Sequence, residues 1–402
     1  MNSINQLGVE LTEKLAQLLA AKSQSVSLPI IKDQPIASDD LHAFCYALLD
    51  EGQLHNAETW AAHMTPSISS DSLLGQVIAS LHNGNLLSPQ FYPLLSQIEH
   101  QLIDWFCSIF QQQQGHFTAG STYANLEALW HAREHNSHDT DVIYGSAATH
   151  YSVIKACQIL GLKFQEIATD NHDRIDPVAL EQACSQQVPI AIVLTIGTSA
   201  CGEIDPLEQC VAISNHYHSW CHIDAAWGGA LALLPEFQDL FSYVAKADSV
   251  SFDPHKALQQ PKPCGILLYQ RPLEPMLLAD ANYLTNHPLQ TLPGSYGGEL
   301  FLSLWLNIIS NGIDDIRSNI RLRLQQADLF AAQLKEKTTW EIHISRTGIV
   351  CFQPPENVDL EELVVKGLFS RAKIADKMVY RTVFSSDKTQ AKALTTALSC
   401  YF

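Results

Sequence analysis

Two stretches near the middle of the chain decide the fold: residues 222–229 read HIDAAWGG, and residues 247–258 read ADSVSFDPHKAL. Each contains a short pattern typical of a buried strand; the first strand ends at Asp224 and the second ends shortly before Lys256. These two residues lie 32 positions apart, about one strand–helix–strand step. Because open α/β sheets bind ligands beyond the carboxyl ends of their strands, we expect both side chains to project into one crevice.

The surrounding sequence repeats this alternation of strands and helices. Residues 190–196 are almost entirely apolar, as a parallel strand covered on both faces should be. A helix is expected over 152–160, and further strands are expected at Val142–Tyr144, Phe164–Ile167 and Gly265–Tyr269. The pattern predicts an α/β fold in which a mainly parallel sheet carries helices on both faces.

The two ends of the chain have different patterns. Residues 1–22 repeat leucine at helical spacing and predict an amphipathic helix, followed by a polar connector over 23–40. Three more helices are expected, at 41–51, 72–82 and 91–110. Toward the C-terminus we expect, in order, a long helix over 299–336, strands near 340–353, a helix near 359–372, a strand near 378–384 and a helix near 387–399. The predicted organisation is an N-terminal helical segment (1–70), a large α/β domain (71–298) and a small C-terminal α/β domain (299–402).

The composition argues against several classes of protein. The chain has 402 residues, of which 46% are hydrophobic, so it can bury a sizeable core without disulfides or a metal. Its net charge of −18 argues against binding to nucleic acid or to an anionic membrane surface. The 10 cysteines form no C-x-x-C pair, which favours free thiols in a reducing compartment. With neither a signal-peptide pattern nor a membrane-length apolar run, we expect a cytoplasmic protein.

The pairing of Asp224 with Lys256 points to a particular chemistry. A buried lysine facing an aspartate at a strand end is the arrangement that pyridoxal phosphate requires, because the amine forms the Schiff base and the carboxylate keeps the pyridine nitrogen protonated. Desolvation of a lysine also makes its amine a better nucleophile. Each residue taken singly has a plainer interpretation, in which Asp224 caps a loop and Lys256 is solvated.

Together with the CG pair at 264–265, these residues resemble the group II pyridoxal-phosphate-dependent amino-acid decarboxylases. That family includes glutamate, aromatic amino acid, histidine, cysteine sulfinate and diaminobutyrate decarboxylases. Further blocks follow the family's order: TAGSTYAN at 118–125, THYSVIK at 149–155, GTSACGEIDP at 197–206 and GS at 294–295. The resemblance covers about residues 60–400.

The resemblance implies a fold type I enzyme that binds pyridoxal 5′-phosphate. Lys256 would carry the cofactor, Asp224 would hold the ring nitrogen, and His150 would stack on the ring and assist proton transfer. Other residues expected to contact the cofactor are Gly120, Ser121, Thr122, Thr198, Ala226 and His255. Ser295 would reach the phosphate of the neighbouring subunit, which implies a homodimer with the active site at the subunit interface. Arg381 would bind the substrate carboxylate, which a guanidinium group fits well.

The sequence departs from the usual family pattern at several positions. Ser121 replaces a usual glycine, and Tyr123 replaces a usual glutamate. Only residues 270–293 fill the gap in which many relatives carry a long loop with a proton-donating tyrosine. In this respect the chain resembles the shorter, histidine-decarboxylase-like branch of the family. Neither Tyr283 nor Tyr296 clearly takes the position of that tyrosine.

The expected function is decarboxylation of an L-amino acid to the amine and CO2, with His150 or Lys256 returning a proton to Cα. Alternatives on the same cofactor are oxidative deamination to an aldehyde and other lyase reactions, and an alternative of another class is a catalytically silent, cofactor-binding scaffold. A metal-dependent hydrolase built on His216, His218 and His222 is remote, because no carboxylate or cysteine set accompanies them, and no metal is expected. Asp253 receives no role at the phosphate, because two anions would repel each other.

Overall fold

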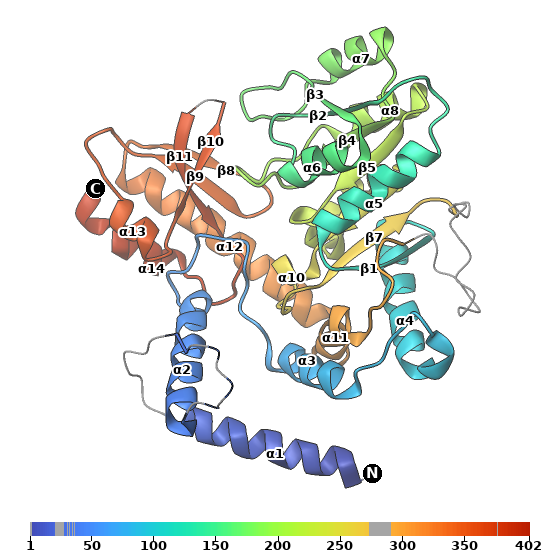
Figure 1. Ribbon diagram of the computed structural model, residues 1–402. Coiled ribbons are helices and arrows are strands. Elements are labelled where there is room, and N and C mark those ends of the chain that lie inside the picture. The colour runs from blue at the N-terminus through green and yellow to red at the C-terminus, as the bar shows by residue number, and fades with distance from the viewer. Residues whose placement is uncertain are drawn as a thin grey trace.

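The structure is a computed structural model that describes residues 2–20, 28–29, 31, 33, 35, 37–272, 291–375 and 377–402, with side chains from residue 6 onward. In these ranges the chain forms two β-sheets, each covered by helices (Figure 1). Half of the expected connector over 23–40 lies outside the described residues, and so does Tyr283.

The larger sheet has seven strands in the order β1-β7-β6-β5-β4-β2-β3. Six of them run in one direction, while β7 pairs antiparallel with both β1 and β6. The prediction of a mainly parallel sheet is therefore confirmed, although the sequence pattern indicated neither β1 nor the reversal of β7. The strands are β1 Gln114–Thr118, β2 Val142–Gly145, β3 Lys163–Glu166, β4 Ala191–Thr195, β5 Trp220–Asp224, β6 Ser249–Phe252 and β7 Gly265–Tyr269.

Helices cover both faces of this sheet. Neighbouring residues along a strand point to opposite faces, so a strand made of apolar residues needs cover on both. Ile143 and Val193 pack on one face with α5 and α6. Ile192 and Leu194 belong to the core on the other face, which includes α4, α7, α8 and α9. These helices are α4 Pro93–Phe110, α5 Ser121–Glu134, α6 Tyr151–Leu160, α7 Pro177–Gln186, α8 Leu207–His216 and α9 Gln238–Val244.

The N-terminal region is helical, as expected, in α1 (Asn2–Leu19), α2 (Ser38–Glu51) and α3 (Ser70–His82). Figure 1 shows α1 extending away from both sheets, with the N-terminus at its far end. The helix α3 packs closely on α11 (Leu302–Asn311), where a Cβ added at Gly75 would lie 2.6 Å from the Leu302 carbonyl oxygen. A glycine is therefore required for this helix contact.

The smaller sheet is antiparallel, in the order β10-β11-β9-β8. The long helix α12 joins the two cores, because Ile320 belongs to the core of the large sheet and Phe330 to that of the small one. Ala61 also lies in the small core, and its carbonyl accepts from Val383 N at 2.8 Å. The domain boundaries at residues 70 and 298 stay predictions. The elements of this region are α12 Ile313–Lys337, β8 Glu341–Ile344, β9 Ile349–Gln353, α13 Glu361–Val365, β10 Ser370–Ile374, β11 Lys377–Val383 and α14 Ala391–Leu398.

Two C-terminal predictions need correction. The expected helix over 299–336 is interrupted at Gly312, whose φ of 79° separates α11 from α12. The expected helix near 359–372 is wrong over its second half, because α13 stops at Val365 and Gly367 turns the chain at φ 79°. Residues 370–374 then pair with β11 as strand β10. Cross-strand pairing, which no local pattern reveals, decides the conformation there.

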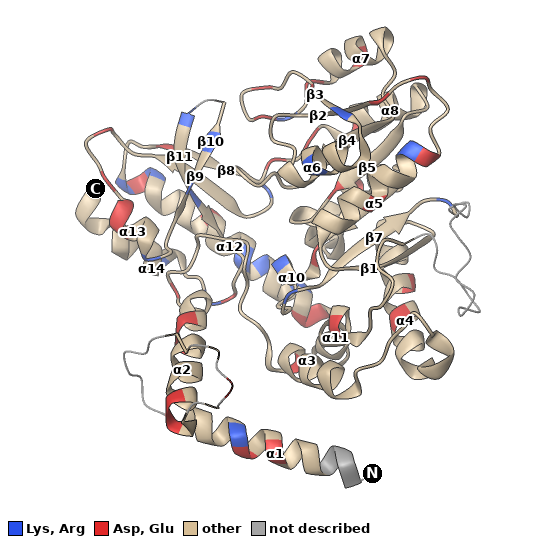
Figure 2. Cartoon of the chain, in the orientation of Figure 1, with Lys and Arg blue, Asp and Glu red and all other residues tan. Residues whose placement is uncertain are grey.

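Short helical turns complete the fold, and α10 (Pro254–Ala257) is the one that carries Lys256. Among the described helices, none is long and apolar enough to cross a membrane. Figure 2 shows basic residues on elements that lie far apart, including α1, α5 and β11. The other turns are η1 Gly52–Asn56, η2 Pro89–Phe91, η3 Gly228–Leu233, η4 Pro235–Phe237, η5 Gly298–Leu300 and η6 Ser399–Tyr401.

Candidate active site

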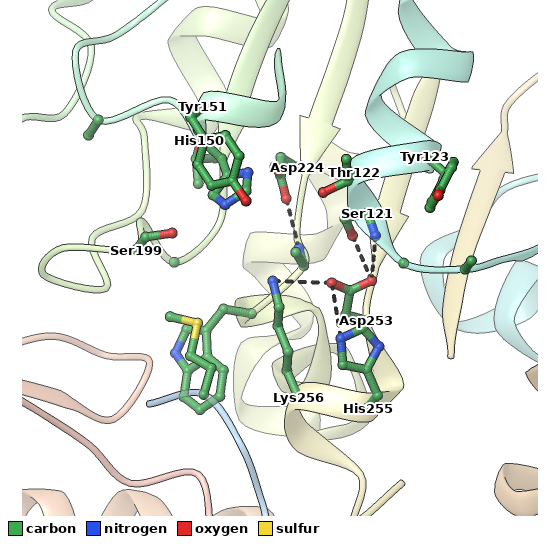
Figure 3. Close-up of a pocket in the computed structure, with 18 residues that line it drawn as sticks. Ser121, Thr122, Tyr123, His150, Tyr151, Ser199, Asp224, Asp253, His255 and Lys256 are labelled. Atoms are coloured by element: carbon green, nitrogen blue, oxygen red, sulfur yellow. Dashed lines mark hydrogen bonds and ion pairs between the residues drawn. The ribbon is translucent and has the colours of Figure 1, made fainter. Parts of the chain in front are cut away.

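A cavity of about 400 Å³ lies at the carboxyl ends of three parallel strands (Figure 3). Thr195 ends β4, Asp224 ends β5 and Asp253 follows β6, and all three line the cavity. Lys256 lies on the short helix after β6 and lines the same cavity. The expectation that Asp224 and Lys256 share one crevice is confirmed, because parallel strands bring their carboxyl ends to one edge of the sheet.

Asp224 is held in place by two donors. Its Oδ1 accepts from the backbone N of Ala226 at 3.0 Å, and its Oδ2 accepts from Asn125 Nδ2 at 2.8 Å. The residue is 4% exposed, so its carboxylate depends on these bonds rather than on water. Ala226 also lines the cavity, where its small side chain leaves room for a flat ligand.

Lys256 is paired with Asp253 rather than with Asp224. Its Nζ lies 3.1 Å from Asp253 Oδ2, and the lysine side chain is 21% exposed while that of the aspartate is 3% exposed. His255 Nε2 lies 3.8 Å from the same oxygen of Asp253, and His255 donates from Nδ1 to the Cys264 carbonyl at 2.6 Å. Burial, the largest influence, lowers the pKa of His255. The carboxylate of Asp253 is therefore the negative charge that pairs directly with the ammonium group of Lys256.

The turn expected to hold a phosphate begins helix α5. Gly120 has φ +114°, a conformation that side chains rarely adopt, and Ser121 and Thr122 follow at the cavity wall. The backbone N and the Oγ of Ser121 both donate to Asp253 Oδ1, at 2.8 and 2.9 Å. The start of the helix favours an anion, and in this structure a carboxylate already lies there.

His150 lines the cavity as the N-cap of α6. Its Nδ1 accepts from the backbone N of Ser152 at 3.3 Å and lies 2.8 Å from Ser152 Oγ. Burial lowers its pKa and outweighs the opposite effect of Asp224. The imidazole ring is therefore held mainly neutral beside the cavity.

Three residues expected in the site do not line this cavity. Thr198 is buried between two residues that do line it, and its Oγ1 accepts from Glu203 N at 3.1 Å. Ser295 Oγ accepts from Asn85 Nδ2 at 3.1 Å. Arg381 donates to the Ala62 carbonyl and to Ser370 Oγ, at 3.2 and 3.0 Å. The roles of these three residues stay predictions.

Arg381 is almost fully buried, and burial lowers its pKa to about 10. Its Nε is a buried atom for which no hydrogen-bond partner is found. Met64, two residues beyond Ala62, lines the cavity, whereas Arg381 itself does not.

Several site residues were missed by sequence reasoning. Tyr123 and Tyr151 line the cavity although both are more than half exposed. Asn125 was quoted in the family block but received no role; its spacing of four from Ser121 places both on one helix face. Met64 and Trp227 complete the lining. Met64 gives no local signal, because it precedes α3 and comes to the site only through folding.

The histidines considered for a metal site are arranged differently. His222 is fully buried and hydrogen-bonded through both ring nitrogens. In the part of the chain that the structure describes, no group of three or more histidine, cysteine, aspartate or glutamate side chains could hold a metal ion. Tyr296 is also engaged elsewhere, since its hydroxyl donates to Glu99 Oε2 at 3.3 Å.

The fold is that of the fold type I, pyridoxal-phosphate-dependent class, and the cavity carries the groups that this cofactor requires. Residues 27–354 match the pyridoxal-dependent decarboxylase conserved domain, and the chain belongs to this family. It is 27% identical to tryptophan decarboxylase TDC1 of Camptotheca acuminata over 330 residues, which are 73% of this chain and 66% of that protein. It is 28% identical to phenylacetaldehyde synthase of a Rosa hybrid cultivar over 330 residues, which are 73% of this chain and 65% of that protein.

The chain spans just under two thirds of the length of these curated relatives. Among solved structures, tryptophan decarboxylase of Catharanthus roseus in complex with L-tryptophan aligns with a TM-score of 0.82 and 20% identity, covering 99% of this chain and 96% of that one. The likeness to that structure confirms the predicted fold.

The residues present fit pyridoxal phosphate. The cofactor needs an amine for its carbonyl group, an anion at its ring nitrogen and donors at its phosphate, and Lys256, Asp224 and the turn at Gly120 line a single cavity. At Gly120 the φ of +114° is rarely adopted by residues with a side chain, so a substitution there would strain the turn. The volume of about 400 Å³ lies within the range of small-molecule sites.

Proposed function

We propose that this chain decarboxylates an L-amino acid to the corresponding amine and CO2, using pyridoxal phosphate held by Lys256. The observation that carries the proposal is the convergence of Lys256, Asp224 and His150 on one cavity at the strand ends. Membership of the pyridoxal-dependent decarboxylase family supports the reaction type.

When bound, pyridoxal phosphate supplies an electron sink for the charge left on Cα as CO2 departs. The chain's own residues prepare the site for that chemistry. Asp224, fixed by Ala226 N and Asn125 Nδ2, presents a carboxylate that keeps a ring nitrogen protonated. Asp253 Oδ2 is close enough to take the proton that Lys256 Nζ must lose before the amine can act as a nucleophile.

An aromatic amino acid is the substrate class we propose to test first. Trp227, Tyr151 and Met64 give the cavity an apolar and aromatic wall. Two of the relatives are named tryptophan decarboxylase and aromatic-L-amino-acid decarboxylase, which supports the same class. Arg381 remains our candidate for the substrate carboxylate, although it does not line the cavity in this structure.

We further propose that the enzyme is a homodimer in the cytoplasm, with the active site at the subunit interface. The exposed leucines of α1, at positions 7, 11, 15 and 19, form an apolar stripe that a second subunit could cover. Tyr123 and Tyr151 are also exposed although they line the cavity, as expected if a partner closes it. The ten cysteines are all free thiols, which supports a reducing compartment.

A second candidate function is formation of an aldehyde by decarboxylation and oxidative deamination. The similarity to phenylacetaldehyde synthase favours this alternative, because that relative matches as much of the chain as the decarboxylase does. Products separate the two: amine plus CO2, or aldehyde plus CO2, ammonia and hydrogen peroxide, because the oxidative route consumes O2 as its two-electron oxidant and takes the aldehyde oxygen from water. A silent scaffold would release none of these.

The test is a screen of the common L-amino acids with purified protein and added pyridoxal phosphate. Carboxyl-labelled substrates report CO2 release, and mass spectrometry identifies the amine or aldehyde. We expect release of CO2 with an equal amount of amine for at least one aromatic amino acid. Release of CO2 from no amino acid, by protein shown to bind the cofactor, would contradict the proposal.

A further inference from the structure

Asn125 lies at the centre of a buried set of hydrogen bonds behind the cavity. Its Nδ2 donates to Asp224 Oδ2 at 2.8 Å and to Ser152 Oγ at 3.0 Å. Its Oδ1 accepts from His222 Nε2 at 2.9 Å and from Ser251 Oγ at 3.0 Å. All five residues are buried, and the amide uses both of its donors and both lone pairs of its oxygen.

The direction of these bonds is fixed by the groups at the two ends. The Asp224 carboxylate only accepts, so Asn125 must turn Nδ2 toward it and Oδ1 toward His222. His222 therefore carries its proton on Nε2. Burial lowers the pKa of His222 to about 4, so the ring is neutral and Nδ1 accepts.

The hydrogen bonds of Ser249, on the other side of His222, agree with this assignment. Ser249 Oγ lies 2.8 Å from His222 Nδ1, and it accepts from Trp220 Nε1 at 2.8 Å. An indole N–H only donates, so the hydroxyl of Ser249 is left to donate to His222. Trp220 at one end of this series of hydrogen bonds only donates, and the Asp224 carboxylate at the other end only accepts. Every hydrogen bond between them therefore has one direction.

The hydrogen bond from Asn125 to Ser152 likewise fixes the direction of the bond between Ser152 and His150. Ser152 Oγ accepts from Asn125, so its hydroxyl proton is available to His150 Nδ1, which is 2.8 Å away. The backbone N of Ser152 donates to the same nitrogen at 3.3 Å. Two donors converge on Nδ1, so a neutral ring must carry its proton on Nε2.

We propose that Asn125 is a positioning residue that joins Asp224 to His150 and that its hydrogen-bond chain fixes His150 as the neutral tautomer with the proton on Nε2. The proposal rests on the proposed function only for the identity of the ligand that Nε2 meets. It restricts the role of His150, because a neutral ring that gave up its Nε2 proton would become an anion. His150 then serves as a hydrogen-bond donor, and Lys256 is left as the carrier of the proton returned to Cα.

The charged groups around His150 oppose one another. Asp224 and Asp253 favour the charged ring, while Lys256 and Lys155 disfavour it. Burial has the largest effect and lowers the pKa of His150. The hydrogen bond from Ser152 acts in the same direction, since it stabilises the ring with an unprotonated Nδ1.

The experiment follows the ring nitrogens of histidine in the full-length, ligand-free protein, labelled with ¹⁵N and titrated by NMR. The His150 signals are assigned by their loss in His150→Gln. We expect a proton on Nε2 and none on Nδ1 at neutral pH. In Ser152→Ala the pKa of His150 should rise by about 0.7, which corresponds to one hydrogen bond of about 1 kcal/mol.

Asn125→Asp removes the donor to Ser152 and draws the serine hydroxyl away from His150, so it should raise the pKa of His150 at least as much. Ser251→Ala is the matched control. It removes an equally buried serine hydroxyl bonded to the same amide, but on the Oδ1 side, and should leave the pKa of His150 unchanged. Circular dichroism checks folding; if Asn125→Asp does not fold, the two serine variants still decide the question.

A proton on Nδ1 in the unaltered protein would overturn the proposal, and so would equal shifts, or no shift, in the two serine variants. The titration needs neither cofactor nor substrate. Failure of the proposed decarboxylation would show in the CO2 assay and leave the NMR result readable.

Discussion

Ser121 and Asp253 are joined twice at the start of α5, because the backbone N–H and the hydroxyl of Ser121 both donate to Asp253 Oδ1, at 2.8 and 2.9 Å. The second oxygen of the carboxylate lies 3.1 Å from Lys256 Nζ. One buried anion thus engages both the helix start expected to bind the phosphate and the lysine expected to carry the cofactor. A phosphate arriving at this turn must compete with Asp253 for its donors.

We therefore predict that Asp253→Asn binds pyridoxal phosphate more tightly than the unaltered apoprotein does. Two like charges about 4 Å apart near a protein surface repel by up to ~4 kcal/mol, and solvent screening leaves part of that. A gain of about tenfold in affinity, or ~1.4 kcal/mol, is expected from fluorescence titration. Pyridoxal, which lacks the phosphate, is the control ligand and should gain less. An equal gain for both ligands would mean that Asp253 acts through Lys256 instead.

Asp224→Ala should retain the cofactor but turn over poorly. The carboxylate supplies a charge-assisted hydrogen bond to the ring nitrogen, worth about 1.5–3 kcal/mol. If that energy is gained mainly in the transition state, kcat falls by about 10- to 150-fold. Steady-state CO2 release measures the effect, with Asp239→Ala on the surface of α9 as the control. Turnover close to that of the control would contradict the role given to Asp224.

Gly75→Ala should destabilise the fold. Its new Cβ would lie 2.6 Å from the Leu302 carbonyl oxygen and 2.6 Å from Ser303 Cα, both backbone atoms that cannot move aside cheaply. We expect a loss of about 1–3 kcal/mol in the free energy of unfolding, measured by urea denaturation. Gly52→Ala is the matched control, since nothing lies within 4 Å of its added Cβ and its φ is −69°. Equal stability of the two variants would show that α3 and α11 are less tightly packed than described.

His222 should make stability depend on pH. Burial lowers its pKa from 6.5 to about 4 in the folded chain, so the unfolded chain takes up the proton first as the pH falls. Its contribution is complete above pH 6.5 and is lost progressively toward pH 4. His222→Gln, which keeps a donor for Asn125, should flatten the decline of the urea midpoint between pH 7 and pH 5. The exposed His216→Gln should not, and equal slopes in all three proteins would count against a neutral, buried His222.

The sequence predicted Asp224 and Lys256 as site residues because the ends of short apolar strands can be recognised from the local sequence pattern. Asp224 ends β5 and Lys256 follows β6, the next strand along the chain, and parallel pairing of the two strands brings these ends together. The role of Asp253 could not be read in the same way. Its separation from Ser121 along the chain is 132 residues, and no local pattern reports which anion a helix start will meet.

The other features that the sequence did not predict also depend on contacts between distant parts of the chain. Residues 370–374 pair with β11 although their neighbourhood has a helical pattern. Asn125 stood in a quoted block, yet its four hydrogen-bond partners come from β5, β6 and α6. The positions of Thr198, Ser295 and Arg381 relative to the cavity likewise depend on packing between elements that are distant in the sequence.

The central claim is that Lys256 carries the cofactor, and peptide mass spectrometry tests it most directly. The protein is loaded with pyridoxal phosphate, reduced with borohydride, digested and analysed for the modified lysine. We predict one modified peptide, the one that contains the DPHK sequence at 253–256, and no such adduct in Lys256→Ala, whereas Lys246→Ala keeps it. A stable adduct on a different lysine, or one that persists in Lys256→Ala, would contradict the account.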